Sequence, residues 1–230
     1  MGEAARKKTY VEDLSRELYD QYNEFTYSYK VDRGLTPEVV REISRQKNEP
    51  SWMTEFRLKA LDIYYQLDVP PWGPNLDELD IDNIITYVKP STEMRYSWDE
   101  VPEDIKNTFV RLGIPQAEHA SLAGVGAQYD SEVVYHSIKE NIRKRGVVYL
   151  DMETALREYE DMVREHFMTL VPPSDHKFVA LHGAVWSGGS FVYVPPGVHV
   201  DIPLQSYFRA NAPGAGQFEH TLIIVDKGAY

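Results

Sequence analysis

The sequence predicts an α+β protein, with helices in its N-terminal part and short strands toward its C-terminus. Residues 178–230 alternate short β-branched and aromatic runs with Gly, Pro, Ser and Asn. The runs 191–194 and 221–225 are each bounded by turn residues, a pattern typical of all-β regions. Turns this frequent leave no room for helices between the strands, which disfavours a doubly wound parallel sheet. A sandwich, a jelly roll and a β-helix remain as candidates.

Helix signals are frequent before this region. Thr36-Pro37-Glu38 predicts a helix start, because Thr caps free N–H groups, Pro fits the first turn and Glu lies near the positive end of the dipole. A second helix is expected from about Pro50, with large apolar residues at helical spacing. Further helices are expected at 98–112, at 131–145 and after the capping residue Asp151. Short strands are expected at 84–88 and 147–150.

The Pro-rich segment 171–175 marks a change from helical to strand-like periodicity, and we place a domain boundary there. The expected organisation is a mostly flexible segment over 1–30, a helical domain over 31–173 and a β-rich domain over 174–230. Residues 122–128 contain two glycines but lack the third glycine of a dinucleotide turn and the Lys-Ser/Thr of a phosphate loop. We expect this run to be a close-packed connection.

The last expected strand, 221–225, is followed by only one turn. An apolar strand left without a neighbour invites edge-to-edge association. Either a partner chain pairs with this strand, or the sequence is the front part of a longer protein. We favour the second interpretation.

Composition narrows the functional classes. The 24 basic and 36 acidic residues give a formal net charge of −12, which argues against nucleic acid or an anionic membrane as the main partner. The chain has no cysteine, so thiolate metal sites, thiol-ligated clusters and cysteine nucleophiles are excluded within it. There is no Gly-x-Ser-x-Gly motif. No apolar run reaches transmembrane length, so we expect a cytoplasmic protein.

Three histidines fall within residues 178–230: His182, His199 and His220. Residues 194–199 resemble a turn of the cupin family, whose metal sites use a His-x-His pair and a following Glu. Here Val200-Asp201 supplies no second His. A metal site built from these three histidines, in a free-standing cupin-like β module that binds a metal or small ligand, is retained as the alternative function.

Two polar residues stand out near the last strands. Arg209 and Asn211 fall on the same side of an extended strand, because side chains alternate between faces. They could orient a ligand or guide a charged species. An outer face in water, or pairing of Arg209 with a carboxylate such as Glu219, explains them equally well.

Several stretches together resemble the SufB-type scaffolds of the SUF iron–sulfur cluster assembly system, in the SufB/SufD family. The matching segments occur in the family's order at 33–36, 39–44, 48–53 (NEPSWM), 56–59, 112–115, 131–135, 184–191 (AVWSGGSF), 207–209, 216–219 and 221–225. The NEPSWM segment favours the B subunit over its D paralogue. The resemblance covers nearly the whole chain from about Arg33, but only about the first half of a complete family member.

The resemblance implies a helical N-terminal domain followed by the first coils of a right-handed β-helix. It also implies a scaffold and not an enzyme, which builds an iron–sulfur cluster with a SufD-like paralogue and a SufC-like ABC ATPase. In the family, the cluster-ligating residues and the ATPase-docking helices belong to later parts, so no cofactor is expected on this chain alone. Arg209 and Asn211 match positions of a polar path implicated in sulfur passage.

Overall fold

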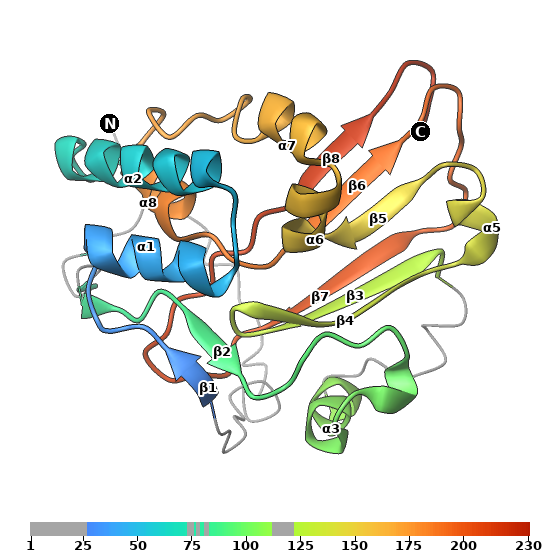
Figure 1. Ribbon diagram of the computed structural model, residues 1–230, viewed down its shortest axis with the longest axis horizontal. Coiled ribbons are helices and arrows are strands. Elements are labelled where there is room, and N and C mark those ends of the chain that lie inside the picture. Colours follow the sequence, from blue (N-terminus) through green and yellow to red (C-terminus); the bar gives the residue numbers. More distant parts are fainter. Residues whose placement is uncertain (1–26, 73–75, 77–78, 81–82, 112–121) are drawn as a thin grey trace, which may run out of the picture.

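The computed structural model describes residues 27–72, 76, 79–80, 83–111 and 122–230, which form an α+β arrangement (Figure 1). Within these residues, two three-stranded sheets lie beside a layer of helices, and a small two-stranded sheet lies below the helices. The elements in chain order are β1 (Tyr27–Lys30), α1 (Pro37–Gln46), α2 (Ser51–Gln66), β2 (Val88–Pro90), the 3-10 helix η3 (Trp98–Glu100), α3 (Glu103–Arg111), β3 (Gly124–Tyr129), β4 (Glu132–Ile138), α5 (Glu140–Arg143), β5 (Val148–Asp151), α6 (Met152–Glu158), α7 (Glu160–His166), α8 (Lys177–Val185), β6 (Ser190–Val194), β7 (Leu204–Arg209) and β8 (Leu222–Val225).

Helices α1 and α2 form as the sequence predicts. The Thr36 hydroxyl accepts a hydrogen bond from the backbone N–H of Val39, and Pro37 is the first helical residue. The buried faces of the two helices share one apolar core with α8, which includes Val40, Leu61 and Ala184. Because this core forms only when the three helices pack together, it fixes their mutual placement.

Helix α8 corrects the prediction that residues 178–230 contain only strands and turns. The His176 ring caps it by accepting a hydrogen bond from the N–H of Phe178, at 3.2 Å. Ala180 and Ala184 are fully buried, in the same core as residues of α2. The apolar residues of this segment adopt a helix because they are buried against the apolar face of α2 and not against a sheet. Tertiary packing of this kind overrides local strand propensity.

The prediction of one long helix over 131–145 is also wrong. Residues 132–138 form β4, and only the short α5 follows it. The partner of β4 is β3, in the segment expected to be a connection, and Asp130, at φ +53°, lies in the turn between them. A β carbon on Gly124 would lie 2.6 Å from Cδ1 of Tyr149, so the glycine allows the close approach of another strand.

The two larger sheets combine strands from both halves of the chain. One has the order β4-β3-β7 and the other β5-β6-β8. In each, an antiparallel pair is extended by a parallel strand: β7 pairs parallel with β3, and β8 pairs parallel with β6. Both sheets therefore contain strands from each side of Pro173, and the domain boundary expected there stays a prediction.

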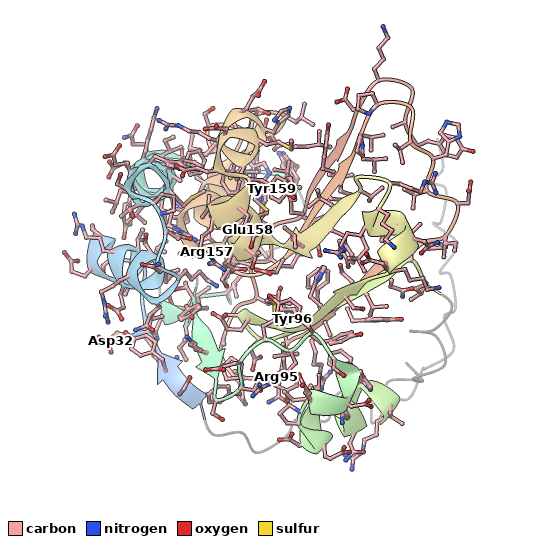
Figure 2. The ribbon with its side chains drawn as sticks, turned by 45° about the vertical axis from the view of Figure 1, so that its right-hand side comes forward. Asp32, Arg95, Tyr96, Arg157, Glu158 and Tyr159 are labelled. Atoms are coloured by element: carbon pink, nitrogen blue, oxygen red, sulfur yellow. The ribbon has the colours of Figure 1, made fainter. Side chains whose placement is uncertain are left out.

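An apolar layer separates the two larger sheets, which lie one above the other in Figure 1. It contains Tyr149 of β5, Val192 and Val194 of β6, and Leu204 of β7. The segment before η3 pairs with the free edge of β4. The backbone N–H of Arg95 donates to the carbonyl of Val134, and the backbone carbonyl of Arg95 accepts from the N–H of His136. Figure 2 labels Arg95 and Tyr96 in this segment.

Strand β8 lies at the edge of its sheet, where Ile223 and Val225 are 61% and 49% exposed. The strand expected at 84–88 appears as β2 a few residues later, with Ile85 in an isolated bridge to Ala215. The flexible segment expected over 1–30 falls mostly outside the described residues, of which 27–30 form β1. No helix in the described part of the chain is long and apolar enough to cross a bilayer.

Candidate functional site

Asp130 organises the surroundings of the two polar residues that the sequence singles out. Its Oδ1 accepts hydrogen bonds from the backbone N–H groups of Asn211, at 2.5 Å, and Ala212, at 2.9 Å. Its own N–H donates to the carbonyl of Arg209, at 2.8 Å. Burial raises the pKa of the Asp130 carboxyl, and the two backbone donors and the charge of Arg209 oppose that rise. The turn between β3 and β4 thereby holds the end of β7.

Arg209 and Asn211 both lie at this turn, although not as two residues of one strand. Arg209 is the last residue of β7, and Asn211 follows the strand and is 5% exposed. The Asn211 amide donates to the hydroxyl of Tyr27, at 3.4 Å. Glu219, suggested above as a partner of Arg209, has its pKa raised by burial, whereas the charge of Arg209 acts on Asp130.

Gln128 of β3 links this turn to the loop before β6. Its Nε2 donates to the carbonyls of Asp130, at 2.8 Å, and Ser187, at 3.3 Å, while its Oε1 accepts from the N–H of Gly189, at 2.7 Å. The neighbouring Gly188 has a φ of +71°, and a β carbon there would lie 2.1 Å from Oε1 of Gln128. Only glycine fits both that backbone conformation and that space.

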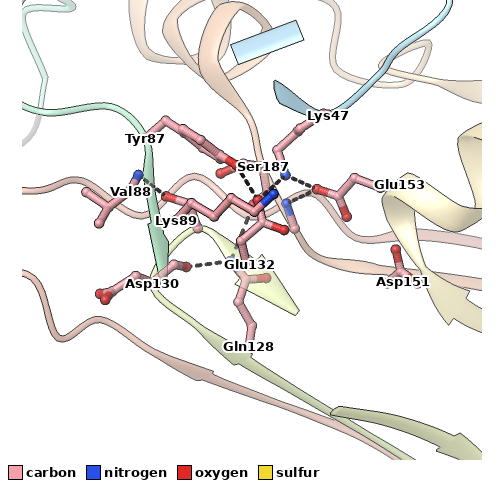
Figure 3. Close-up of polar contacts among 12 residues, drawn as sticks. Lys47, Tyr87, Val88, Lys89, Gln128, Asp130, Glu132, Asp151, Glu153 and Ser187 are labelled. Atoms are coloured by element: carbon pink, nitrogen blue, oxygen red, sulfur yellow. Dashed lines mark hydrogen bonds and ion pairs between the residues drawn. The ribbon is translucent and has the colours of Figure 1, made fainter. Parts of the chain in front are cut away.

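A buried ion cluster continues from the same loop (Figure 3). Oε1 of Glu153 accepts from the N–H of Gly188, at 2.6 Å, and lies 2.5 Å from the Lys47 ammonium. The ammonium also lies 3.2 Å from Glu132, which accepts from the Tyr87 hydroxyl at 2.5 Å. The Lys47 side chain is only 2% exposed. A charge this deeply buried requires paired partners, and the two carboxylates supply them.

The pKa values of the cluster follow from its charges. Burial alone would lower the pKa of Lys47, but the charges of Glu132 and Glu153 reverse this and hold the pKa above its usual value. Burial would raise the pKa of Glu153, but the Lys47 charge, together with the hydrogen bonds from Lys47 and the backbone, more than offsets this and lowers the pKa. Burial, followed by the charge of Glu132, raises the pKa of Tyr87. The lysine and Glu153 therefore stay ionised at neutral pH.

These contacts form one continuous polar network from Asn211 through Asp130, Gln128 and the Gly188 loop to Lys47. Its members come from the end of α1, from β3 and β4, from α6 and from the loop between α8 and β6. It thus links the helical layer to the β4-β3-β7 sheet and to the loop that leads into β6. A cavity of about 170 Å³ adjoins it, lined by Gln46, Lys47, Met94, Glu132, Val133, Asp151, Glu153, Thr154 and Arg157.

Asp151 and Arg157 lie on opposite ends of α6 beside this cavity, and Arg157 is labelled in Figure 2. The Asp151 carboxylate caps α6 by accepting from the N–H of Thr154, at 2.8 Å, as the sequence predicts. Burial, and then the charge of Glu153, raises the pKa of Asp151 to about 6. The cavity is therefore a charged recess, with its carboxylates largely committed to neighbouring side chains and backbone.

The structure does not assemble the three histidines into a metal site. Nε2 of His182 lies 2.8 Å from Nδ1 of His220, whereas the ring of His199 stacks on Tyr230. Within the described residues, no three His, Cys, Asp or Glu side chains form a group that could hold a metal ion. Strand order explains this outcome, because His199 follows β6 in a loop remote from the loop that carries His220.

Comparison with known proteins identifies the family. A model described as the SufBD protein N-terminal region matches residues 41–206. The chain belongs to the SufBD family. It is 54% identical over 217 residues to the Bacillus subtilis protein named iron-sulfur cluster assembly protein SufB, covering 94% of the chain and 47% of that relative. A SufBD family protein of Mycobacterium tuberculosis is 58% identical over 199 residues, covering 86% of the chain and 24% of that relative.

The SufBD match extends through most of the network. Residues 41–206 include Lys47, Gln128, Glu132 and Glu153, while Arg209 and Asn211 lie just beyond its end. A SufBD family protein of Staphylococcus epidermidis is 53% identical over 217 residues and likewise extends well past this chain, which covers 47% of it. The chain thus spans about half the length of several curated relatives that it matches.

Proposed function

We propose that this chain is the N-terminal part of a SufB-type scaffold on which iron–sulfur clusters are assembled. The observation that carries the proposal is the 54% identity, over 94% of the chain, to a protein named as the iron–sulfur cluster assembly protein SufB. Because the chain has no cysteine, thiolate ligands for a cluster would have to come from other segments or subunits. Its own contribution would be structural support and a polar route, without catalysis of a bond-making step.

The same proposal includes the start of a right-handed β-helix. After β6 the chain alternates between the two larger sheets, placing β7 in one and β8 in the other. Each of these strands adds parallel to an earlier strand of its sheet. Repetition of this alternation would stack coils on the exposed edges of β7 and β8, and parallel crossovers of this kind are nearly always right-handed.

Arg209 and Asn211 are the residues that we propose for sulfur passage. A persulfide is anionic near neutral pH, so a guanidinium would attract it and an amide would orient it. The placement of both residues at the Asp130 turn supports this role, because the turn fixes the backbone that carries them. The SufD-like paralogue and the SufC-like ABC ATPase are the proposed partners, in keeping with the family.

A chimera tests the proposed function. The aligned part of Bacillus subtilis SufB is replaced by this chain, and the chimera is expressed in cells depleted of their own SufB. We expect it to restore the activity of iron–sulfur enzymes such as aconitase. A matched chimera carrying Gly188→Val should not restore activity, because the loop that joins the network cannot close. A folded, abundant wild-type chimera that restores nothing would overturn the proposal.

A further inference from the structure

A second cavity, of about 390 Å³, lies away from the ion cluster, between the α7–α8 region and the start of β8. Its walls are formed by His166, Met168, Thr169, Leu170, Val171, His176, Phe178, Val179, His182, His220, Thr221 and Leu222. No Asp, Glu, Lys or Arg is among these lining residues. Cavities of this size with mainly apolar walls and a few polar groups are typical small-molecule sites.

The polar groups in this cavity include a half-buried histidine pair. Nε2 of His182 and Nδ1 of His220 are 2.8 Å apart. Burial and then the charge of Arg57 lower the pKa of His182 to about 4, while burial, His182 and Arg57 lower that of His220 to about 3. The facing charged group, Arg57, is itself buried in an ion pair with Glu49, at 2.5 Å. Both rings are therefore neutral at pH 7.

Two neutral imidazoles that share one hydrogen bond retain one outer N–H and one outer lone pair, whichever ring donates. Among the described residues, neither outer nitrogen of the pair makes another hydrogen bond. His220 also packs against Phe167, with ring centroids 4.3 Å apart, and is held at 5.9 Å from the ring of Trp186. The pair is thus a rigid group that offers one donor and one acceptor without a net charge.

Exposed apolar side chains lie at the same cavity. Leu170 is 95% exposed and Val171 is 50% exposed, both in the turn between α7 and α8. The aromatic ring of Phe178 completes this apolar wall. Large apolar groups gathered at a cavity mark a surface that gains free energy when a ligand covers it.

We propose that this cavity binds an uncharged, flat heteroaromatic molecule that carries both a hydrogen-bond donor and an acceptor. The absence of Asp, Glu, Lys and Arg from the lining disfavours an ionic ligand, because a buried ion would find no permanently charged partner there. The aromatic walls favour a flat ring, and the histidine pair matches one donor and one acceptor. This binding role is independent of the proposed part in cluster assembly.

Benzimidazole is a suitable probe, since it is neutral at pH 7.5 and carries one ring N–H and one ring lone pair. Its binding to the purified chain is measured by calorimetry and ligand-observed NMR in the presence of EDTA. The comparison compounds are 1-methylindole, which is neutral but lacks that donor–acceptor pair, and the 1,3-dimethylbenzimidazolium cation. We expect benzimidazole to bind with one-to-one stoichiometry. Each comparison compound should bind roughly tenfold more weakly or worse, because it can make neither the donor nor the acceptor contact.

Variants locate the binding. Leu170→Glu changes a side chain that is already in solvent, so the fold is preserved, and it should weaken benzimidazole binding by about tenfold. Val110→Glu, on α3 and 56% exposed, is the matched control and should leave binding unchanged. His220→Phe should weaken binding of benzimidazole but not of 1-methylindole.

Three outcomes would overturn the proposal. One is absence of saturable benzimidazole binding to the folded wild-type chain. Another is equal affinity for the cation and for benzimidazole. The third is benzimidazole binding that appears only with added Zn²⁺ and disappears with EDTA, which would make the histidine pair part of a metal site.

Discussion

Replacing Lys47 by Met would leave the carboxylates of Glu153 and Glu132 without their shared counter-charge. The Lys47 side chain is 2% exposed and that of Glu153 is 10% exposed, with nitrogen and oxygen 2.5 Å apart. Removing one partner of such a buried pair typically costs about 3–5 kcal/mol. Since whole domains are stable by only ~5–15 kcal/mol, the loss would be a large fraction of the total.

Urea unfolding followed by circular dichroism measures this loss. The double variant Lys47→Met/Glu153→Gln should recover part of it, because no ionised carboxylate is then left facing the methionine. Arg45→Met is the control, as Arg45 pairs with Glu42 on an exposed helix face, and its midpoint should not change measurably. If the free energy of unfolding of Lys47→Met lies within about 1 kcal/mol of the wild-type value, the ion cluster does not hold the helical layer to strand β4.

Four further predictions follow from other contacts. Gly188→Ala should lower stability by about 2 kcal/mol or more in thermal melts, because of its positive φ and the nearby Gln128; an unchanged melting temperature would contradict the close packing. Asp151 has a folded pKa of about 6, above its unfolded value, so the folded state favours its protonated form. Its contribution to folding stability is therefore present at low pH and is lost as the pH rises through about 6. Asp151→Asn keeps the cap and should therefore gain stability relative to the wild type between pH 4 and 7; a pH-independent difference would refute this. Ile223→Lys on the exposed edge of β8 should reduce self-association in light scattering, whereas Val110→Lys should not. Gln128→Leu removes both ends of a bridge and should cost about 2–3 kcal/mol, and a smaller loss would show that water replaces it.

Local signals predicted part of the fold. The Thr36 and Asp151 caps, the strands at β5, β6 and β8, and the turn at Ser187–Ser190 all depend on residues close in sequence, whose chemistry is visible without tertiary contacts. The β3–β4 hairpin is not predicted, because the apolar residues of β4 also fit a helical period and the two glycines of β3 suggest a connection. In the folded chain, β3 is covered on its other edge by β7, and that long-range pairing decides the conformation.

The candidate site was only partly predictable. The sequence singles out Arg209 and Asn211, whose role stays a prediction, whereas Lys47 carries no local signal beyond its place at the end of a helix. Its partners Glu132 and Glu153 lie 85 and 106 residues away along the chain. No local pattern distinguishes a buried lysine from a solvated one. The sequence shows His182 and His220 only as two of three histidines. Their contact forms because the fold places the segment before β8 beside α8, and the two residues lie 38 positions apart in the chain.

Asn211→Ala in the chimeric scaffold tests the proposed function most directly. The contacts of Asn211 with Asp130 come from the backbone N–H, which alanine retains, whereas the side-chain amide donates a long hydrogen bond to Tyr27, at 3.4 Å. Losing that side chain should lower the melting temperature by only about 2–4 °C relative to the unsubstituted chimera. Cluster yield after anaerobic assembly, measured as bound iron and sulfide, should fall to background. A yield equal to that of the unsubstituted chimera, or a yield that falls only together with the melting temperature, would contradict a role for Asn211 in sulfur passage.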